Sequence, residues 1–373
     1  MLADLATPLT YVFAFLFVLG VVIFVHELGH FLAARWCGVE VETFSIGFGP
    51  QLAGFRDRQG TLWRLAALPL GGYVKFKGDE NAASMPDAEK LATLTPEGRR
   101  GNFHTAPLRH RAFIVFAGPL ANFVMAFAVF SLFFMTVGRT IIDPRVSAVE
   151  AGSAAERAGL KPGDRVLQIG GSVIRSFDEL QRVVMQSPNQ ELLLLVDRDG
   201  VSTALRATPE LREVDDRQGG TVKIGVLGIV RSNAPDDIRR ETYDPLTALS
   251  LGLNETWFQI QAPIIFIRNL IAGQGDANML GGPIRIAEIS GKVASAGFDK
   301  LIWLTAVISV SIGLLNLFPI PILDGGHLLY YGIEAILGRP LSQAAQEVGF
   351  RIGLVLLVML MIFATKNDVS RYF

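Results

Sequence analysis

Two histidines and a glutamate lie close together near the N-terminus. His26, Glu27 and His30 form the pattern H-E-x-x-H directly after an uncharged run of 21 residues, Leu5–Val25. Because positions i and i+4 share one face of a helix, the two imidazoles can bind one metal ion. Glu27 beside them can take a proton from a water at that metal. Ionisable groups near membrane depth are costly and by default indicate function. The pattern therefore predicts a metal-dependent hydrolytic site at a membrane helix.

A catalytic zinc site needs three protein ligands and an open position. Cys37 is the single cysteine, which excludes a multi-cysteine site and an internal disulfide. Asp324 is the best remaining candidate, because it follows the uncharged run Leu301–Leu323, in which Pro319 and Pro321 interrupt the helix. Such a break can turn the carboxylate toward a site rather than toward lipid. The alternative is that Asp324 only caps a helix end at the water interface.

The composition predicts a membrane protein. Of 373 residues, 50% are hydrophobic and 18% are charged, whereas soluble domains usually carry about a quarter charged residues. The 34 basic and 35 acidic residues nearly cancel, which disfavours a nucleic-acid partner. Uncharged runs of sufficient length to cross about 30 Å of hydrocarbon occur at Leu5–Val25, Ala112–Gly138, Leu301–Leu323 and, if Arg351 snorkels, Ile352–Thr365. We expect a polytopic α-helical protein with four transmembrane helices.

The distribution of basic residues predicts an orientation. The segment from Arg35 to Arg111 holds 11 Lys or Arg, and no Lys or Arg precedes the first run. The positive-inside rule then places this loop in the cytoplasm, and the N-terminus and residues 139–300 outside.

Two segments that flank the expected spans are less regular. Residues 43–78 alternate like short strands between turns, which indicates a membrane-associated β-hairpin region, with an ordinary cytoplasmic hairpin as the alternative. Residues 246–272 are apolar with sparse charges. We expect them to form amphipathic helices at the outer membrane face, and a fifth span is the alternative.

Residues 140–230 lack long apolar runs and predict a small α+β module. Ser176 and Glu179 form a capping box before an amphipathic helix, and Asp199-Gly200 marks a hairpin. The run Gly152–Ile174 resembles the bacterial form of the PDZ domain, which takes up an extended peptide or chain end by strand addition. The alternative is a spacer or a steric plug.

The metal motifs together carry a resemblance that covers nearly the whole chain. H-E-x-x-H and the segment Asn316–Gly325 (N-x-x-P-x-P-x-L-D-G) resemble the site-2 protease family of intramembrane zinc metalloproteases. Gly118–Phe123 (GPLANF), Gly71–Lys75 (GGYVK) and Leu280–Ile284 (LGGPI) resemble further segments of that family. The order of these segments is similar to the regulator-of-sigma-E protease type. Many members of that type carry two PDZ domains, whereas this chain has room for one.

The resemblance implies roles for individual residues. His26, His30 and Asp324 would bind Zn²⁺, and Glu27 would act as the general base. The resemblance also implies a substrate-binding or oxyanion role for Asn316, and we expect Asn122 to support the ligands or the packing. His327 either supports a ligand or is a cytoplasmic-face residue. Apart from the resemblance, the β-rich region leads us to expect that Gly72, Tyr73 and Val74 form an edge that pairs with an unwound substrate strand.

The resemblance also implies a cellular role. The protein would lie in the bacterial inner membrane, with its N-terminus and PDZ domain periplasmic and its active site open to the cytoplasm. Its partners would be single-pass membrane proteins such as anti-sigma factors or signal-peptide remnants, a peptide or C-terminus in the PDZ groove, and lipid. It would act in regulated intramembrane proteolysis during a stress response. Two other hypotheses are a membrane-anchored PDZ scaffold with an inert metal site and a transporter that uses buried ionisable residues.

These observations divide the chain into successive segments. We expect a first transmembrane helix in 1–36, a cytoplasmic loop with the β region in 37–108, a second helix in 109–138, the PDZ domain in 139–232, interfacial helices in 233–300, a third helix in 301–328, a short cytoplasmic loop in 329–347 and a fourth helix with the C-terminus in 348–373.

Overall fold

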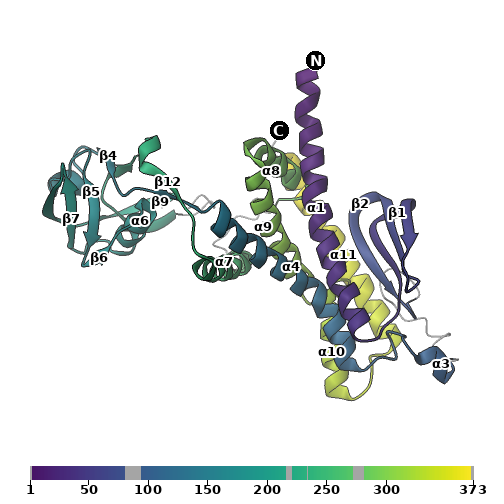
Figure 1. The fold of residues 1–373 in the computed structure, drawn as a ribbon. Helices are drawn as coiled ribbons and strands as arrows, with labels where there is room; N and C mark the ends of the chain where they lie inside the picture. Colours follow the sequence, from purple (N-terminus) through teal and green to yellow (C-terminus); the bar gives the residue numbers. More distant parts are fainter. Residues whose placement is uncertain (1, 80–93, 216–220, 233, 272–280, 371–373) are drawn as a thin grey trace. The chain divides into compact units, whose positions relative to one another are not determined.

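The computed structural model describes residues 2–79, 94–215, 221–232, 234–271 and 281–370 (Figure 1). Leu280, the first residue of the predicted LGGPI segment, lies outside these ranges. The chain forms two compact units. The first contains residues 1–132, 249–265 and 278–373, and the second contains residues 133–248 and 266–277.

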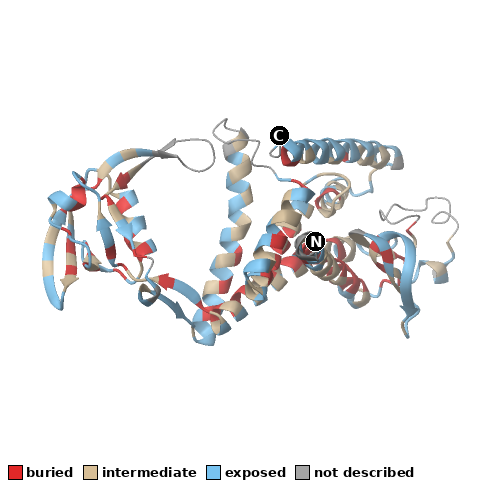
Figure 2. Ribbon diagram, turned by 90° about the horizontal axis from the view of Figure 1, so that it is seen from above, coloured by how far each residue is buried: buried red, intermediate tan, exposed pale blue. Residues whose placement is uncertain are grey.

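Four helices of the structure are long and apolar enough to cross a membrane. They are α1 (Leu2–Trp36), α4 (Leu108–Thr136), α9 (Phe298–Asn316) and α11 (Gln343–Ser370). Figure 2 shows α11, which ends near the C label, with most of its surface exposed, and its apolar side chains Leu360 and Ile362 are 48% and 65% exposed. The length and composition of these helices confirm the expectation of four apolar spans.

The segment after α9 differs from the expected third helix of 301–328. The helix α9 ends at Asn316, and a new helix, α10 (Asp324–Leu337), begins at the aspartate itself. Pro319 and Pro321 cause the break, because proline lacks a backbone N–H and cannot continue a helix. Residues 329–337, expected in a short loop, are therefore helical, and Gly338 ends α10 in the left-handed conformation at φ 68°.

Helix α8 (Pro283–Ala296) packs beside α1. A side chain at Gly291 would overlap the Tyr11 ring, so the absence of one permits this close approach. At the start of α8, the buried carboxylate of Asp368 accepts hydrogen bonds from the backbone N–H of Gly282 at 2.9 Å and of Arg285 at 3.1 Å. Asp368 lies on α11 and thus supplies a helix cap that α8 itself lacks.

The region 43–78 forms two long bent strands rather than several short ones. Strand β1 (Val41–Arg56) pairs with β2 (Leu62–Phe76) along two stretches, so that Thr43 lies opposite both Lys75 and Leu62. The halves are therefore ordered 72–76, 41–46, 62–66 and 51–56, with 72–76 at one edge. The sheet packs on the second half of α1, where the Phe31 ring contacts Phe44 and Trp63 at centroid distances of 5.6 and 4.9 Å.

The turn between these strands holds the end of α1. Asp57 pairs with Arg35 and accepts a hydrogen bond from Trp63 Nε1 at 3.0 Å. Burial alone would raise the pKa of Asp57, but the hydrogen bonds from Trp63, Arg35 and the backbone outweigh it and lower this pKa to about 2. The carboxylate therefore stays ionised. The short helix α3 (Pro96–Arg99) follows later in the same loop.

The second unit contains the α+β module. Its main sheet has the order β6-β5-β7-β8, and its core includes the fully buried Val166, Leu180 and Leu194. The predicted capping box forms in part, because Ser176 Oγ accepts from the Glu179 N–H at 3.2 Å, while Glu179 accepts at 2.8 Å from the N–H of Arg175, one residue before the N-cap. The elements are β3 (Arg139–Ile142), β4 (Val146–Val149), α5 (Ala154–Arg157), β5 (Arg165–Ile169), β6 (Ser172–Val173), α6 (Phe177–Gln186), β7 (Leu192–Arg198), β8 (Val201–Ala207), β9 (Glu210–Asp215), β10 (Thr221–Val226), β11 (Ile229–Arg231), the 3-10 turn η1 (Pro235–Asp237) and β12 (Ile238–Glu241).

The apolar segment 246–272 is one helix where we expected several. Helix α7 (Pro245–Ile271) runs through Pro263, and it is not among the candidate spans found in the described residues. Its Gly252 packs on Ser131 of α4.

Candidate metal centre

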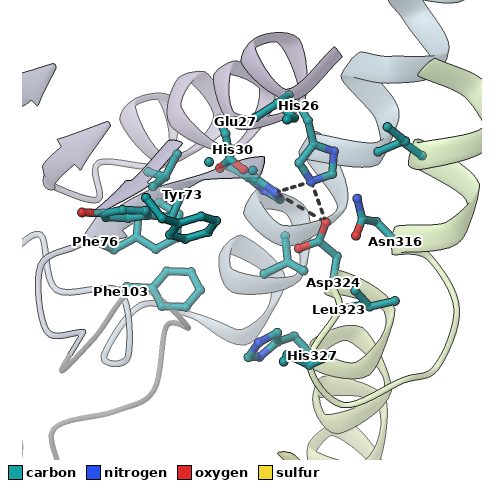
Figure 3. Close-up of a pocket in the computed structure, with 18 of the residues that line it drawn as sticks. His26, Glu27, His30, Tyr73, Phe76, Phe103, Asn316, Leu323, Asp324 and His327 are labelled. Atoms are coloured by element: carbon teal, nitrogen blue, oxygen red, sulfur yellow. Dashed lines mark hydrogen bonds and ion pairs between the residues drawn. The ribbon is translucent and has the colours of Figure 1, made fainter. Parts of the chain in front are cut away.

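Three groups from α1 and α10 converge on one point (Figure 3). Asp324 Oδ2 lies 3.1 Å from His26 Nε2 and 3.5 Å from His30 Nε2, and the two Nε2 atoms are 3.2 Å apart. Two imidazole nitrogens and a carboxylate oxygen are a ligand set that zinc uses in hydrolytic enzymes. Asp324 Oδ2 is also buried without a hydrogen bond from the described residues, as expected of an atom that serves a cation. The residues present fit a zinc ion.

Helix α4 lies behind both imidazoles and contacts the ring nitrogens that face away from this point. His30 Nδ1 is 2.9 Å from the backbone oxygen of Ile114, and His26 Nδ1 is 3.2 Å from Nδ2 of Asn122. The later histidine on α1 contacts the earlier residue on α4, so the two helices run antiparallel. Groups behind the ligands commonly orient a metal-binding histidine and fix its tautomer.

Small residues allow α1 and α4 to approach closely at this level. A Cβ on Gly118 of α4 would lie 2.5 Å from Cε1 of His30 and closer still to Nε2. A Cβ on Gly29 of α1 would lie 2.8 Å from Cβ of Ala121. Small residues at helix crossings are typical of membrane proteins. The sequence marks Gly118 only as part of a motif and does not reveal that it makes room for His30.

An ion pair connects α4 to the helix that carries Asp324. The Arg111 guanidinium contacts both carboxylate oxygens of Glu334, at 2.5 and 3.2 Å, and lies over the Tyr331 ring at 5.0 Å from its centroid. Such a two-pronged contact fixes geometry as well as charge. The partners are 223 residues apart in the chain, and sequence reasoning did not identify them.

A cavity of about 430 Å³ opens beside the converging groups. Glu27 faces it and is 9% exposed, and its carboxylate makes no hydrogen bond within the described part of the chain. Asn316, the last residue of α9, also lines it. His327 borders the cavity on the side of Phe103, one helical turn after Asp324 (Figure 3).

The edge strand 72–76 forms another wall of the cavity. Gly72, Tyr73 and Val74 all line it. A Cβ on Gly72 would lie 2.9 Å from Cγ of Glu27, so only glycine lets the strand approach α1 this closely. The structure therefore brings the predicted site residues to one cavity, except Asn122, which lies behind His26 and does not line it.

Comparisons with known proteins identify the family of this chain. Residues 14–360 match peptidase family M50. A protein of Agrobacterium fabrum, provisionally named a zinc metalloprotease, is 46% identical over 360 residues, which is 96% of each chain. Metalloprotease MmpA of Caulobacter vibrioides is 42% identical over 379 residues, which is 96% of this chain and 94% of that protein. The PDZ domain of an SdrC-like protein from Listeria innocua matches 25% of this chain and 96% of its own, at 15% identity and a TM-score of 0.20.

The chain belongs to peptidase family M50, the site-2 protease family. It is a zinc metalloprotease with several membrane-spanning helices. The hypotheses of an inert scaffold and of a transporter are therefore not needed.

Proposed function

We propose that this metalloprotease is an intramembrane endopeptidase that cuts the membrane segment of single-pass proteins. His26, His30 and Asp324 would hold the zinc ion, and their convergence between apolar helices carries the proposal. When bound, zinc supplies a Lewis acid that activates water and polarises a peptide carbonyl. His26 and His30 lie inside the apolar helix α1, which continues to Trp36, so the bond to be cut must reach the protein at membrane depth.

Glu27 would transfer the proton in this reaction. Its carboxylate faces the cavity without a hydrogen-bond partner in the described residues, so it can accept the proton of the attacking water. The same carboxyl group can then pass the proton to the leaving nitrogen. The amide of Asn316 borders the cavity on another side and can donate a hydrogen bond to the oxyanion that develops on the carbonyl.

The edge strand would hold the substrate in an extended form. A transmembrane helix resists proteolysis because its carbonyls are hydrogen-bonded internally, so it must unwind first. The 72–76 edge of β2 pairs with no further strand in the described residues, and there the Phe76 N–H points away from β1 and donates to Asp79 at 2.9 Å. Backbone groups alternate along a strand, so Val74 and Gly72 present theirs to the same side. A substrate strand paired there would pass beside Glu27, because Gly72 contacts that side chain.

We further propose that the protein lies in a bacterial inner membrane, with the N-terminus and the PDZ-like module periplasmic and the site open to the cytoplasm. Helix α7 would lie at the outer face, because its large apolar side chains Leu253 and Trp257 are exposed. The substrates would be anti-sigma factors or signal-peptide remnants already shortened outside. The module would exclude untrimmed substrates or bind a new C-terminus in its groove.

One comparison tests the peptidase mechanism. Zinc content and cleavage of a model single-span substrate are measured for the wild type, Glu27→Gln and Asp324→Asn in proteoliposomes. We expect Glu27→Gln to keep zinc and lose cleavage, and Asp324→Asn to lose both. Cleavage by Glu27→Gln at the wild-type rate would refute the assignment of the general base.

A deletion tests the role of the module. Removal of residues 140–230 should permit cleavage of substrates with untrimmed outer domains. If the shortened protein still cleaves trimmed substrates and rejects untrimmed ones, the module does not gate access.

A further inference from the structure

The side chain of Asn122 is fully buried behind His26, and its oxygen has no hydrogen-bond partner in the part of the chain that the structure describes. Its Nδ2 lies 3.2 Å from His26 Nδ1. Its Oδ1 is buried and has no donor among the described residues. A buried polar atom without a partner is costly and calls for an explanation.

The role of Asn122 rests on the proposed function, because the metal assignment places a requirement on this contact. If His26 binds zinc through Nε2, that nitrogen needs its lone pair, and the proton of the neutral ring must sit on Nδ1. Nδ1 is then a donor. The amide NH₂ of Asn122 is also a donor, so these two groups cannot pair.

A half-turn of the amide would give the His26 Nδ1–H an acceptor and give Asn122 Oδ1 a donor. The terminal torsion of asparagine is roughly two-fold, so rotation by 180° exchanges Oδ1 and Nδ2 within the same space. Oδ1 then accepts from His26 Nδ1–H and gains the donor that it lacks. The contact becomes one that metal-binding histidines commonly make, in which the second ring N–H donates to an oxygen.

The neighbouring histidine already has this arrangement. His30 Nδ1 lies 2.9 Å from the backbone oxygen of Ile114, which can only accept. His30 must therefore carry its proton on Nδ1, which leaves Nε2 free for a metal. Ile114, Gly118 and Asn122 recur every four residues on one face of α4, so a single helix face supports both imidazoles.

We infer that Asn122 is a positioning residue that accepts a hydrogen bond from His26 through its side-chain oxygen and fixes the tautomer that binds zinc. The opposite polarity, in which the amide donates to Nδ1, would favour a proton on Nε2 and oppose metal binding. Variants that keep only one of these two capacities distinguish the alternatives.

The test measures zinc affinity by chelator competition on the purified full-length protein. Asn122→Leu removes the hydrogen bond at similar volume and should weaken zinc binding about 10- to 100-fold. Asn122→Asp can accept but, when ionised, cannot donate, and should bind zinc within about threefold of wild type. Ser131→Ala is the matched control, because Ser131 lies on the same helix outside the site and its buried hydroxyl has no partner among the residues described. This variant should bind zinc like the wild type.

Several results of these measurements would overturn the inference. Asn122→Leu could retain wild-type affinity while His26→Ala loses zinc, which would overturn this inference alone. Asn122→Asp could lose as much affinity as Asn122→Leu at an unchanged melting temperature. A wild type that binds no zinc, or a His26→Ala variant that keeps it, would overturn the metal assignment as well.

A measurement on the unmutated protein stands beside these variants. Nitrogen-15 NMR of the histidine-labelled, zinc-loaded wild type should show His26 protonated at Nδ1. A proton on Nε2 would overturn the inference even if a variant failed to fold.

Discussion

Replacement of Gly118 by alanine is the most direct perturbation of the metal centre. The added Cβ would lie 2.5 Å from Cε1 and 2.9 Å from Cδ2 of His30, with Nε2 as the nearest atom. Carbon atoms pack at about 3.5–4.0 Å, so the ring or the helix must move by about 1 Å. The imidazole has little room to move away, because its Nδ1 is held by the Ile114 carbonyl on the same helix as the new methyl group.

The size of this displacement sets the expected loss. Zinc–nitrogen bonds of about 2.0–2.1 Å tolerate deviations of about 0.2 Å, which is roughly a fifth of the required shift. We expect Gly118→Ala to weaken zinc binding at least about 100-fold, equivalent to about 2.7 kcal/mol. Chelator competition on the purified protein measures the affinity, and cleavage of a single-span substrate at saturating zinc measures any remaining activity.

A matched control separates this effect from the general cost of a new methyl group. Gly20 lies on α1, and an added Cβ there meets nothing within 4 Å. Gly20→Ala should leave zinc affinity and cleavage unchanged. Wild-type affinity in Gly118→Ala would show that His30 does not bind zinc in the observed position, and it would refute the reasoning from close packing.

Three further perturbations address the supports of the site. Glu334→Gln weakens the two-pronged contact with Arg111 that holds α10, and it should lower zinc affinity about tenfold, whereas unchanged affinity would show that α10 is held by other contacts. Val74→Pro removes a backbone N–H from the 72–76 edge of β2, and it should cut turnover at least about tenfold with unchanged zinc content. Val74→Ala is the control. Equal turnover of the proline and alanine variants would exclude strand pairing. Asp57→Asn loses charged hydrogen bonds, including the one from Trp63, and should lower stability by about 1–3 kcal/mol in thermal melts from pH 5 to 8. Since the pKa of Asp57 is lowered to about 2, the stabilisation is present above about pH 4 and fades as the pH falls toward 2, so a difference that persists at pH 2 would contradict this assignment.

Several features of the protein follow from local patterns in the chain. The apolar runs mark the spans, because a helix that crosses hydrocarbon needs about 20 apolar residues wherever it lies in the fold. The capping box of Ser176 and the hairpin at Asp199-Gly200, whose φ angles of 53° and 85° are both positive, depend only on residues within a few positions. The same holds for His26 and His30, whose spacing alone puts them on one helix face.

Other features depend on how distant segments pack. Asp324 reaches both imidazoles because of the turn after α9 and the contact of Arg111 with Glu334. Arg111 and Glu334 are far apart in the chain. Sequence spacing did not indicate that Gly118 makes room for His30, or that Asn122 meets His26 across 96 residues. Local patterns are decided by neighbours along the chain. The metal centre is decided by the crossing of α1 with α4 and the start of α10, because these contacts join side chains whose separation in sequence carries no information about their distance in space.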